Sequence, residues 1–430
     1  MAKRHVPGLR WWIIGLIATA TVINYIDRTS LAVMWPDISK ELDLSKDQYA
    51  TIVASFMIAY ALGQALSGRL FDWVGTRMGF VLSIFVWSVS CGLHGIARGI
   101  ASFSFFRSML GLSEAGNWPG ATKASAEWFP IKERAFAQGI FNAGASLGAV
   151  MSAPLIAFLY LWLGWKATFV VVAALGIVWI IPWWFLNKAE PGRHPWISDD
   201  EREHILAGQK TNASPESERI IPVKELISYR QSWSVIVSRF FVDPIWWMFV
   251  NWLPIYLAEQ FGFDIKQIGL FAWMPYLGAA IGSLSGGWMS GFLMSRGWSV
   301  DKARKRAIVV GGCITFPAFI LAAMATTPLM AVLLIAVVLG GFQMMINNIQ
   351  TLPSDYFSGK SVGSLAGLGG MSAVVGTLVF STWLIPAISS VSYIPVFLMG
   401  AALVPLGVGA VYYFGGTIQR VDLQAANAQK

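Results

Sequence analysis

Long apolar runs separated by short polar connections make up most of this chain. A run of about 20 apolar residues is long enough to cross a bilayer as a helix, and twelve such runs follow one another here. The pattern predicts an all-α polytopic membrane protein with twelve transmembrane helices. The predicted spans are 11–35, 48–71, 79–97, 101–122, 136–160, 165–187, 233–258, 267–295, 306–325, 328–350, 362–385 and 391–415.

The longest polar stretch, residues 188–230, divides the spans into two groups of six. It carries 15 of the 54 charged residues, and Ser198 followed by acidic residues predicts the start of a short helix. We expect one or two surface helices and a flexible part around 212–218, and no catalytic domain. The predicted organisation is an N-terminal six-helix bundle over 1–187, a cytoplasmic central loop over 188–232 and a C-terminal six-helix bundle over 233–430.

Composition and charge agree with a membrane setting. The chain is 56% hydrophobic and 13% charged, with a mean hydropathy of +0.58, whereas soluble domains are about 25% charged. If the N-terminus is cytoplasmic, the inner segments hold sixteen Lys and Arg, including Lys3, Arg4 and Lys430, and the outer connections hold five. This bias predicts that both termini are cytoplasmic. The net charge of +8 then indicates contact with anionic lipid and no nucleic-acid partner.

Two pairs of charged residues lie in the first and fourth predicted spans. Asp27 and Arg28 are adjacent in the first span, and Arg107 and Glu114 are seven residues apart in the fourth, on one helix face. A charge at membrane depth costs about 2.5–3.5 kcal/mol on insertion scales, so these residues need a function. From their depth along the two spans we expect Asp27, Arg28 and Arg107 to meet in the outer half, with Glu114 deeper.

The connection after the second span carries a recognisable motif. Residues 68–77 have the pattern Gly-x-x-x-Asp-x-x-Gly-x-Arg, with Arg69, Asp72 and Arg77 as its charges, and Gly286 and Gly287 lie at the corresponding place in the second half. The motif resembles the signature loop of the major facilitator superfamily. The resemblance implies two six-helix bundles around a central cavity with alternating access. Glycines allow close helix packing, and pairing of Asp72 with the arginines is expected to act as a gate; the alternative is an ordinary tight connection.

Further stretches narrow the resemblance. The motifs around Asp27 and Arg28, around Arg107 and Glu114, and at 127–134 resemble the anion:cation symporters of that superfamily. In the second half, residues 239–244, 271–275 and 370–373 are similar to bacterial hexuronate transporters. The resemblance implies a monomeric, multi-pass protein of the bacterial inner membrane that imports an organic monoanion, such as galacturonate or glucuronate, together with protons.

Under this resemblance the intramembrane charges acquire roles. A guanidinium binds a carboxylate bidentately and does not titrate, so Arg28 or Arg107 is expected to hold the substrate carboxylate. A carboxylic acid can take up and release a proton, so Asp27 and Glu114 are expected to couple proton movement. Protonation would release the arginines from internal pairs. The alternative is a static ion network that fixes helix packing; Asp27 itself departs from the usual hexuronate-carrier pattern.

Other polar residues within the spans are candidates for binding substrate hydroxyls, or alternatively for joining helices by hydrogen bonds. They are Tyr60, Asn142, Gln343, Asn347 and Ser372. Ser372 stands where related carriers tend to have Asn.

Other function classes are disfavoured. The spans show no nucleophile–base set, no phosphate-binding loop for ATP and no His or Cys at metal-ligand spacing, so we expect neither an enzyme, nor a metal site, nor any cofactor besides the coupling proton. A receptor would not need paired intramembrane acids. Carriers of a hexonate, an aldarate or another carboxylate, and a facilitator or antiporter without proton coupling, remain alternatives.

Overall fold

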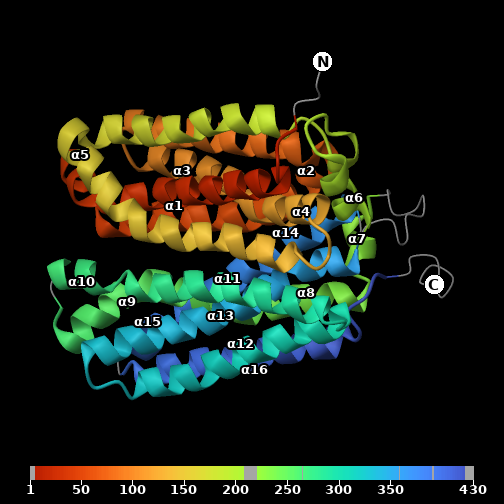
Figure 1. The fold of residues 1–430 in the computed structure, drawn as a ribbon. Coiled ribbons are helices and arrows are strands. Elements are labelled where there is room, and N and C mark those ends of the chain that lie inside the picture. The colour runs from red at the N-terminus through yellow and green to blue at the C-terminus, as the bar shows by residue number, and fades with distance from the viewer. Residues whose placement is uncertain (1–4, 208–219, 264, 358, 390–391, 422–430) are drawn as a thin grey trace.

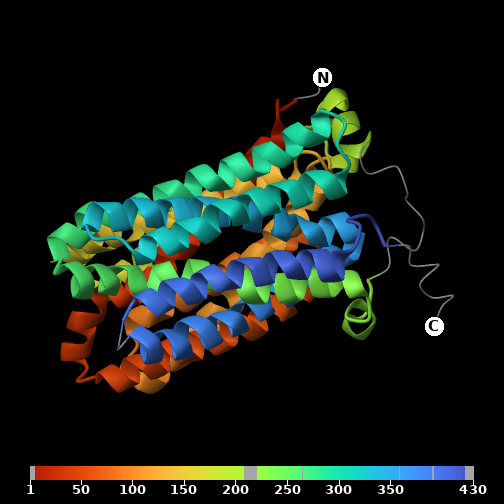
Figure 2. The same ribbon diagram turned by 90° about the horizontal axis from the view of Figure 1, so that it is seen from below.

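The structure, a computed structural model, describes residues 5–207, 220–263, 265–357, 359–389 and 392–421. Within these ranges the chain forms helices that run side by side in two bundles (Figures 1 and 2). The segment 212–218, predicted to be flexible, and the predicted cytoplasmic residues Lys3, Arg4 and Lys430 lie outside the described ranges.

The N-terminal half holds five long or medium helices and one short 3₁₀ turn. They are α1 (Leu9–Glu41), α2 (Lys46–Leu93), η1 (His94–Ile96), α3 (Ile100–Glu114), α4 (Asn117–Trp128) and α5 (Arg134–Leu186).

Helix α2 is two antiparallel helices joined at Gly75. Gly75 has φ 79° and ψ 168°, a conformation that only glycine adopts readily. The rings of Phe71 and Phe80 on either side have centroids 5.1 Å apart, whereas nine residues of straight helix would separate them by about 13 Å. The chain therefore folds back within one residue, as the predicted spans 48–71 and 79–97 require.

Helix α5 reverses in the same way at Gly164, where φ is 72° and ψ is 168°. A Cβ on Gly144 would lie 2.6 Å from the Ala18 carbonyl, and Trp179 donates to the Leu16 carbonyl at 2.7 Å. Both halves of α5 thus pack along α1, and they correspond to the fifth and sixth predicted spans.

The central loop and the C-terminal half follow. They comprise η2 (Pro191–Arg193), α6 (Asp199–Ala207), α7 (Val223–Leu226), α8 (Arg230–Val242), α9 (Pro244–Phe261), α10 (Ile265–Phe271), α11 (Met274–Ser295), α12 (Val300–Ala323), α13 (Pro328–Tyr356), η5 (Gly359–Ser361), α14 (Val362–Thr377), the π-helical η6 (Leu378–Leu384), α15 (Ile385–Ser389) and α16 (Ile394–Gly415).

The central loop packs on one end of the N-terminal bundle. As predicted, α6 begins at Asp199, and Ser198 Oγ accepts a hydrogen bond from the Glu201 amide at 3.2 Å. Glu201 in turn accepts from the amides of Leu9 and Arg10 at the start of α1. An acidic side chain in this position also complements the positive end of the α1 dipole. Helix α8 begins at Arg230, inside the range predicted for the loop.

Prolines divide three of the crossings into shorter helices. Proline lacks an amide hydrogen and clashes with the carbonyl four residues earlier. Pro119 breaks the helix at Ala115, between α3 and α4, and Pro244 starts α9 directly after α8. Pro275 likewise lies in the first turn of α11, after α10 ends. Two of these breaks, at α3/α4 and α8/α9, lie near the cavity described below.

The prediction of twelve crossings in two bundles is confirmed within the described residues. By length and composition, eight helical stretches there qualify as membrane spans, and two of them are the doubled helices that reverse at Gly75 and Gly164. The remaining two crossings are α3 with α4 and α10 with α11, which the proline breaks shorten. Two hydrophobic cores match the bundles: one uses residues 9–205 with Val374, the other 221–418 with Tyr25 and Ala145.

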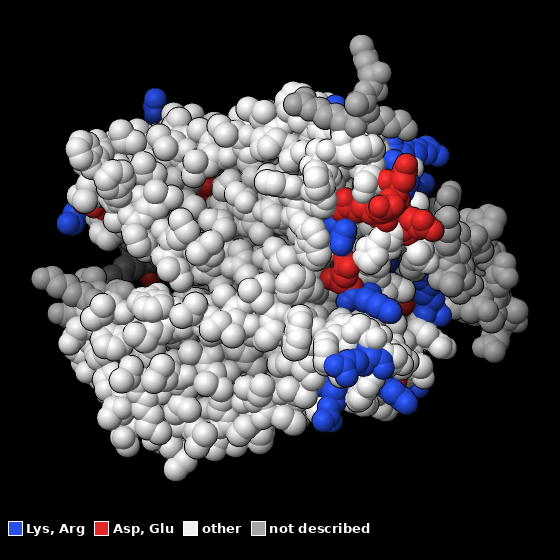
Figure 3. Space-filling model, viewed as in Figure 1, with Lys and Arg blue, Asp and Glu red and all other residues white. Residues whose placement is uncertain are grey.

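Charge gathers at one end of the molecule. Lys, Arg, Asp and Glu cluster at the end that carries α6 and α7, while the middle of the face in Figure 3 is almost uncharged. The beginning of α1 and the end of α16 both lie at this charged end. Arg10, near the start of α1, pairs with Glu133. Lys305 donates to the Gly416 carbonyl just after α16, and the neighbouring Arg304 donates to the Ile131 carbonyl. Figure 3 shows a hollow between the two bundles at the opposite end.

Candidate functional site

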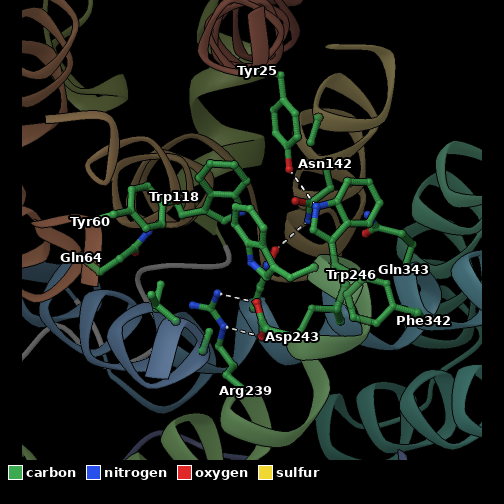
Figure 4. A pocket seen from close by; sticks show the side chains of 17 residues that line it. Tyr25, Tyr60, Gln64, Trp118, Asn142, Arg239, Asp243, Trp246, Phe342 and Gln343 are labelled. Atoms are coloured by element: carbon green, nitrogen blue, oxygen red, sulfur yellow. Dashed lines mark hydrogen bonds and ion pairs between the residues drawn. The ribbon is translucent and has the colours of Figure 1, made fainter. Parts of the chain in front are cut away.

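A cavity lies between the two bundles. Helices α1, α2, α4 and α5 line it from one side, and α8, α9, α13 and α14 from the other (Figure 4). The lining residues are Tyr25, Tyr60, Gln64, Trp118, Asn142, Ala145, Arg239, Asp243, Trp246, Trp247, Phe342, Gln343, Ile346, Gln350, Gly370, Ala373 and Val374. Aromatic rings mixed with a few polar groups are typical of a small-molecule site.

Arg28 and Glu114 form a buried ion pair beside this cavity. Arg28 Nε and Nη2 donate to Glu114 Oε2 at 3.2 and 3.1 Å. Arg28 lies 4.8 Å from the ring centroid of Tyr60 and 5.3 Å from that of Trp247, two residues that line the cavity. Arg28 Nη1 and Glu114 Oε1 have no hydrogen-bond partner. The pair therefore keeps one donor and one acceptor unused.

Asp27 faces away from this pair. Successive residues on a helix point about 100° apart, so Asp27 is directed towards α2, where Cys91 Sγ donates to Asp27 Oδ1 at 3.6 Å. Asp27 is fully buried, and its Oδ2 has no partner. The predicted meeting of Asp27 with the Arg28 side chain is thus not what the structure has; Glu114 holds Arg28 instead.

Arg107 braces the backbone of α1. Its Nη2 donates to the Arg28 carbonyl at 2.6 Å, and its Nε and Nη1 are buried without partners. Its guanidinium lies 5.0 Å from the Phe56 ring. Neither Arg107 nor Arg28 lines the cavity itself, but Arg28 lies against two lining residues, Tyr60 and Trp247, and is therefore the nearer of the two predicted carboxylate-binding arginines.

Three of the five predicted hydroxyl-binding residues line the cavity: Tyr60, Asn142 and Gln343. Asn347 lies behind them, where its Oδ1 accepts from Asn142 Nδ2 at 2.6 Å. Ser372 is directed elsewhere, because its hydroxyl donates to the Ile236 carbonyl on α8 at 2.8 Å. Asn347 and Ser372 therefore form hydrogen bonds between helices, which is the alternative role that the sequence left open for them.

Hydrogen bonds cross from one bundle to the other at the cavity. Trp246 Nε1 on α9 donates to the Tyr25 hydroxyl on α1 at 2.9 Å, and Asn142 on α5 also donates to Gln350 Oε1 on α13 at 2.7 Å. Any rearrangement that separates the bundles here must break these bonds.

Sequence reasoning missed a second ion pair that lies in the cavity wall itself. Arg239 and Asp243, one turn apart at the end of α8, are joined by two hydrogen bonds of 3.2 and 3.0 Å (Figure 4). Both are buried. The signal was present: they are charged residues inside an apolar run, which is the criterion that singled out Asp27 and Glu114.

At the charged end, Asp72 joins the two bundles. Its carboxylate accepts from Lys123 Nζ at 3.0 Å and from the amides of Gly363 and Ser364 in the first turn of α14. Arg69 and Arg77, the expected partners, instead donate to backbone carbonyls of Ile221, Lys188 and Trp184. The arginines reach the loop and the end of α5, and Lys123 on α4 pairs with the Asp72 carboxylate.

Glycines bring the bundles together at the same end. A Cβ on Gly68 would lie 2.2 Å from the Gly363 carbonyl, and one on Gly287 would lie 2.4 Å from the Ala135 carbonyl. Both contacts join one bundle to the other. Arg304 adds a third, because it pairs with Asp355 at 2.9 Å and donates to the Ile131 carbonyl. The described structure is thus closed at the charged end and hollowed at the other.

Comparison with known proteins places these features in a family. A sequence model of the Major Facilitator Superfamily matches residues 17–381. A hexuronate transporter of Escherichia coli strain K12 is 32% identical over 409 residues, covering 94% of this chain and 93% of that protein. A probable galactarate/D-glucarate transporter of the same strain is 33% identical over 325 residues, covering 72% of this chain and 73% of that protein.

The fold has counterparts among solved structures. A crystal structure of the human organic anion transporter MFSD10 superposes with a TM-score of 0.69 at 15% identity, covering 94% of this chain and 100% of that one. At this identity the likeness concerns the fold alone.

Proposed function

This chain belongs to the major facilitator superfamily, and we propose that it imports an organic monoanion of the sugar-acid class together with protons. Membership makes it a membrane transporter and not an enzyme. A hexuronate such as galacturonate or glucuronate is the favoured substrate, because a hexuronate transporter is similar over nearly the whole chain. The similarity to a probable galactarate/D-glucarate transporter keeps other sugar acids as the second candidate.

The Arg28–Glu114 pair carries this proposal. A sugar-acid carboxylate needs a fixed cation, and Arg28 is the cation nearest the cavity on the N-terminal side. Glu114 occupies that cation in the described structure. Glu114 is fully buried and Arg28 is largely buried, and an ion pair in such a setting is weak evidence for pure stabilisation. A carboxylate that blocks an arginine beside a substrate cavity is instead suited to a switch.

We infer the following order of events. A proton from the outer side neutralises the Glu114 carboxylate, and its attraction for Arg28 is lost. Arg28 then turns two N–H donors to the substrate carboxylate, and its unused Nη1 contributes to a bidentate contact. After the cavity opens inwards, Glu114 releases its proton and pairs with Arg28 again, which expels the substrate. One proton accompanies each anion through this site.

Asp27 and Arg107 form a second buried charge site next to the first. Asp27 Oδ2 and two Arg107 nitrogens lack partners, so each retains hydrogen-bonding capacity. Arg107 holds the Arg28 carbonyl, which couples its position to the substrate-binding arginine. We propose that Asp27 is a further proton site and that Arg107 positions α1.

Alternating access requires the closed, charged end of the protein to open. The contacts of Asp72 with α14 and the tight glycine contacts hold the charged end shut, and they must separate for release. The charged end of the protein would face the cytoplasm of a bacterial cell. Both termini would then be cytoplasmic, and the protein would lie in the inner membrane. A monomer suffices, because the cavity lies within one chain.

Uptake into proteoliposomes tests the proposal. Labelled galacturonate and glucuronate are offered with and without an inward proton gradient, and an ionophore is then added. We expect accumulation that the gradient drives and the ionophore abolishes. Uptake that only equilibrates would show a facilitator, and accumulation of another sugar acid alone would overturn the hexuronate assignment while leaving the coupling intact.

A further inference from the structure

The Arg239–Asp243 pair lines the cavity with a carboxylate that Arg239 holds in place and that keeps unused acceptor capacity. Arg239 Nε and Nη2 donate to the two Asp243 oxygens, and Arg239 Nη1 donates to the Ala366 carbonyl at 3.3 Å. Each nitrogen of this guanidinium therefore has one acceptor within the protein, which uses three of its five N–H donors. A carboxylate accepts about four hydrogen bonds, and each oxygen of Asp243 receives one from Arg239. Both oxygens can accept more.

Two amide oxygens of the cavity lining also lack hydrogen-bond donors. Gln64 Oε1 on α2 and Gln343 Oε1 on α13 are buried, have no hydrogen-bond partner and belong to the cavity lining. Figure 4 shows Gln64 and Gln343 on two sides of the cavity, with Arg239 and Asp243 between and below them. This part of the cavity thus has unused acceptor capacity at three places, which hydrogen donors of a ligand can satisfy.

Sugar hydroxyls supply such donors, and a carboxylate does not. A hydroxyl donates one hydrogen bond and accepts others, so the hydroxyl-rich end of a sugar acid can satisfy Asp243 and the glutamines. A second carboxylate would bring no hydrogen and would place its negative charge against that of Asp243. Like charges juxtaposed in a desolvated interface are strongly unfavourable.

We propose that Asp243 is a specificity determinant that selects sugar acids with one carboxylate and rejects aldarates, which have a carboxylate at each end. This inference rests on the proposed function: Arg28 holds the single carboxylate of the substrate, and Asp243, fixed by Arg239, receives the hydroxyls of the other end. Arg239 orients Asp243 and does not itself bind the anion. The two ion pairs thereby read opposite ends of the same molecule.

A competition experiment on the unaltered protein gives the first test. Uptake of labelled galacturonate into proteoliposomes is measured against unlabelled galactonate and galactarate, which differ by a terminal hydroxymethyl group or a second carboxylate. Galactonate is expected to compete at a concentration at least about tenfold below that of galactarate. Equal competition by both acids would overturn the proposal, although galacturonate uptake itself would still support the proposed function.

The variant Asp243→Asn gives the second test. It removes the negative charge and leaves Arg239 available for an anion, so galactarate is expected to gain potency relative to galactonate by about tenfold or more. Asp243→Glu keeps the charge and should keep the rejection of galactarate. Asp301→Asn, which neutralises a carboxylate in the first turn of α12 outside the cavity, should behave like the unaltered protein.

The outcomes separate the two proposals. An unchanged galactarate-to-galactonate ratio in Asp243→Asn overturns the role of Asp243 alone. If Asp243→Asn does not reconstitute, the competition measurements on the unaltered protein and on Asp243→Glu still test the proposal. Both proteins carry a negative charge at position 243, so galactarate competing as well as galactonate in either one would overturn the role of Asp243. If the unaltered protein accumulates galactarate and not galacturonate, both this inference and the hexuronate assignment fall.

Discussion

Trp246 and Tyr25 join the two bundles across the cavity through a hydrogen bond of 2.9 Å, with the indole as donor and the phenol as acceptor. Their rings also meet edge to face, with centroids 6.4 Å apart. One residue belongs to α9 and the other to α1, so this contact links the two bodies whose relative movement transport requires.

Removing this bond should reduce the stability of the described arrangement. We expect Tyr25→Phe and Trp246→Phe each to lower the apparent melting temperature in detergent, and the double variant to lose less than the sum. The coupling should correspond to about 0.5–1.5 kcal/mol, the net value of a hydrogen bond. The matched control combines Tyr25→Phe with Trp233→Phe, whose indole donates to the Ile227 carbonyl just after α7, and these two effects should add. Additive losses in Tyr25→Phe with Trp246→Phe would show that the bond contributes nothing.

Neutralising Glu114 should uncouple the carrier from the proton gradient. Glu114→Gln cannot bind and release a proton, and its amide attracts Arg28 far less than a carboxylate does. We expect gradient-driven accumulation to fall to the level without a gradient, while exchange of labelled for unlabelled substrate continues. Glu203→Gln on the exposed face of α6 is the control. If Glu114→Gln still accumulated substrate, the coupling role would be wrong and the pair with Arg28 would be structural.

A side chain at Gly370 should displace Gln64. Gly370 lines the cavity, and a Cβ there would lie 2.1 Å from Gln64 Oε1. Gly370→Ala is therefore expected to displace the Gln64 amide into the cavity and to raise the KM for uptake about tenfold, the effect of losing about 1.4 kcal/mol of binding. Gly409→Ala on α16, where a Cβ meets no atom within 4 Å, should change little. Replacing Gln64 by Ala in the Gly370→Ala background should restore space; unchanged uptake in Gly370→Ala would contradict this geometry.

The central loop should loosen in acid because of His194. His194 is fully buried; its Nε2 donates to the Leu186 carbonyl at 3.0 Å and its Nδ1 accepts from the Trp196 amide at 3.2 Å. Burial lowers the pKa of His194 below its ordinary 6.5. Between these two pKa values the unfolded loop binds a proton that the folded loop does not. Stability that is present above about pH 6.5 is therefore lost as the pH falls through this window.

Hydrogen exchange checks this pH dependence. Amide protection of residues 191–207, corrected for intrinsic exchange rates, should be lower at about pH 5.5 than at about pH 7.5. In His194→Asn the difference between the two pH values should disappear. Equal protection at both pH values in the unaltered protein would contradict the role of His194.

Hydropathy alone was enough to predict the crossings, because each needs a long apolar run whatever its neighbours are. It did not locate the proline breaks between α3 and α4 or between α8 and α9, since a broken helix and a continuous one share the same apolar composition. The reversal at Gly75 follows from the glycine in the motif. Polar spacing also predicted that Ser198 begins α6, as the structure has it.

The candidate site was predictable in its residue types and less so in its contacts. Charge at membrane depth identified Arg28 and Glu114, which the structure pairs. The same reasoning placed Asp27 with Arg28, although neighbours on a helix point to different sides and only the packing of α2 decides where Asp27 points. Ser372 was chosen by comparison with related carriers, and the rotation of α14 directs it to α8 instead.

The single-residue reversals at Gly75 and Gly164 have a consequence for biogenesis. With no loop between the paired helices, neither helix can insert into the bilayer while its partner remains outside it. We expect the two halves of α2, and the two halves of α5, to insert as preformed helical hairpins. Reporter tags placed at these turns should block insertion of both helices, whereas the connection between α12 and α13 at 324–327 offers a position where a tag can report sidedness.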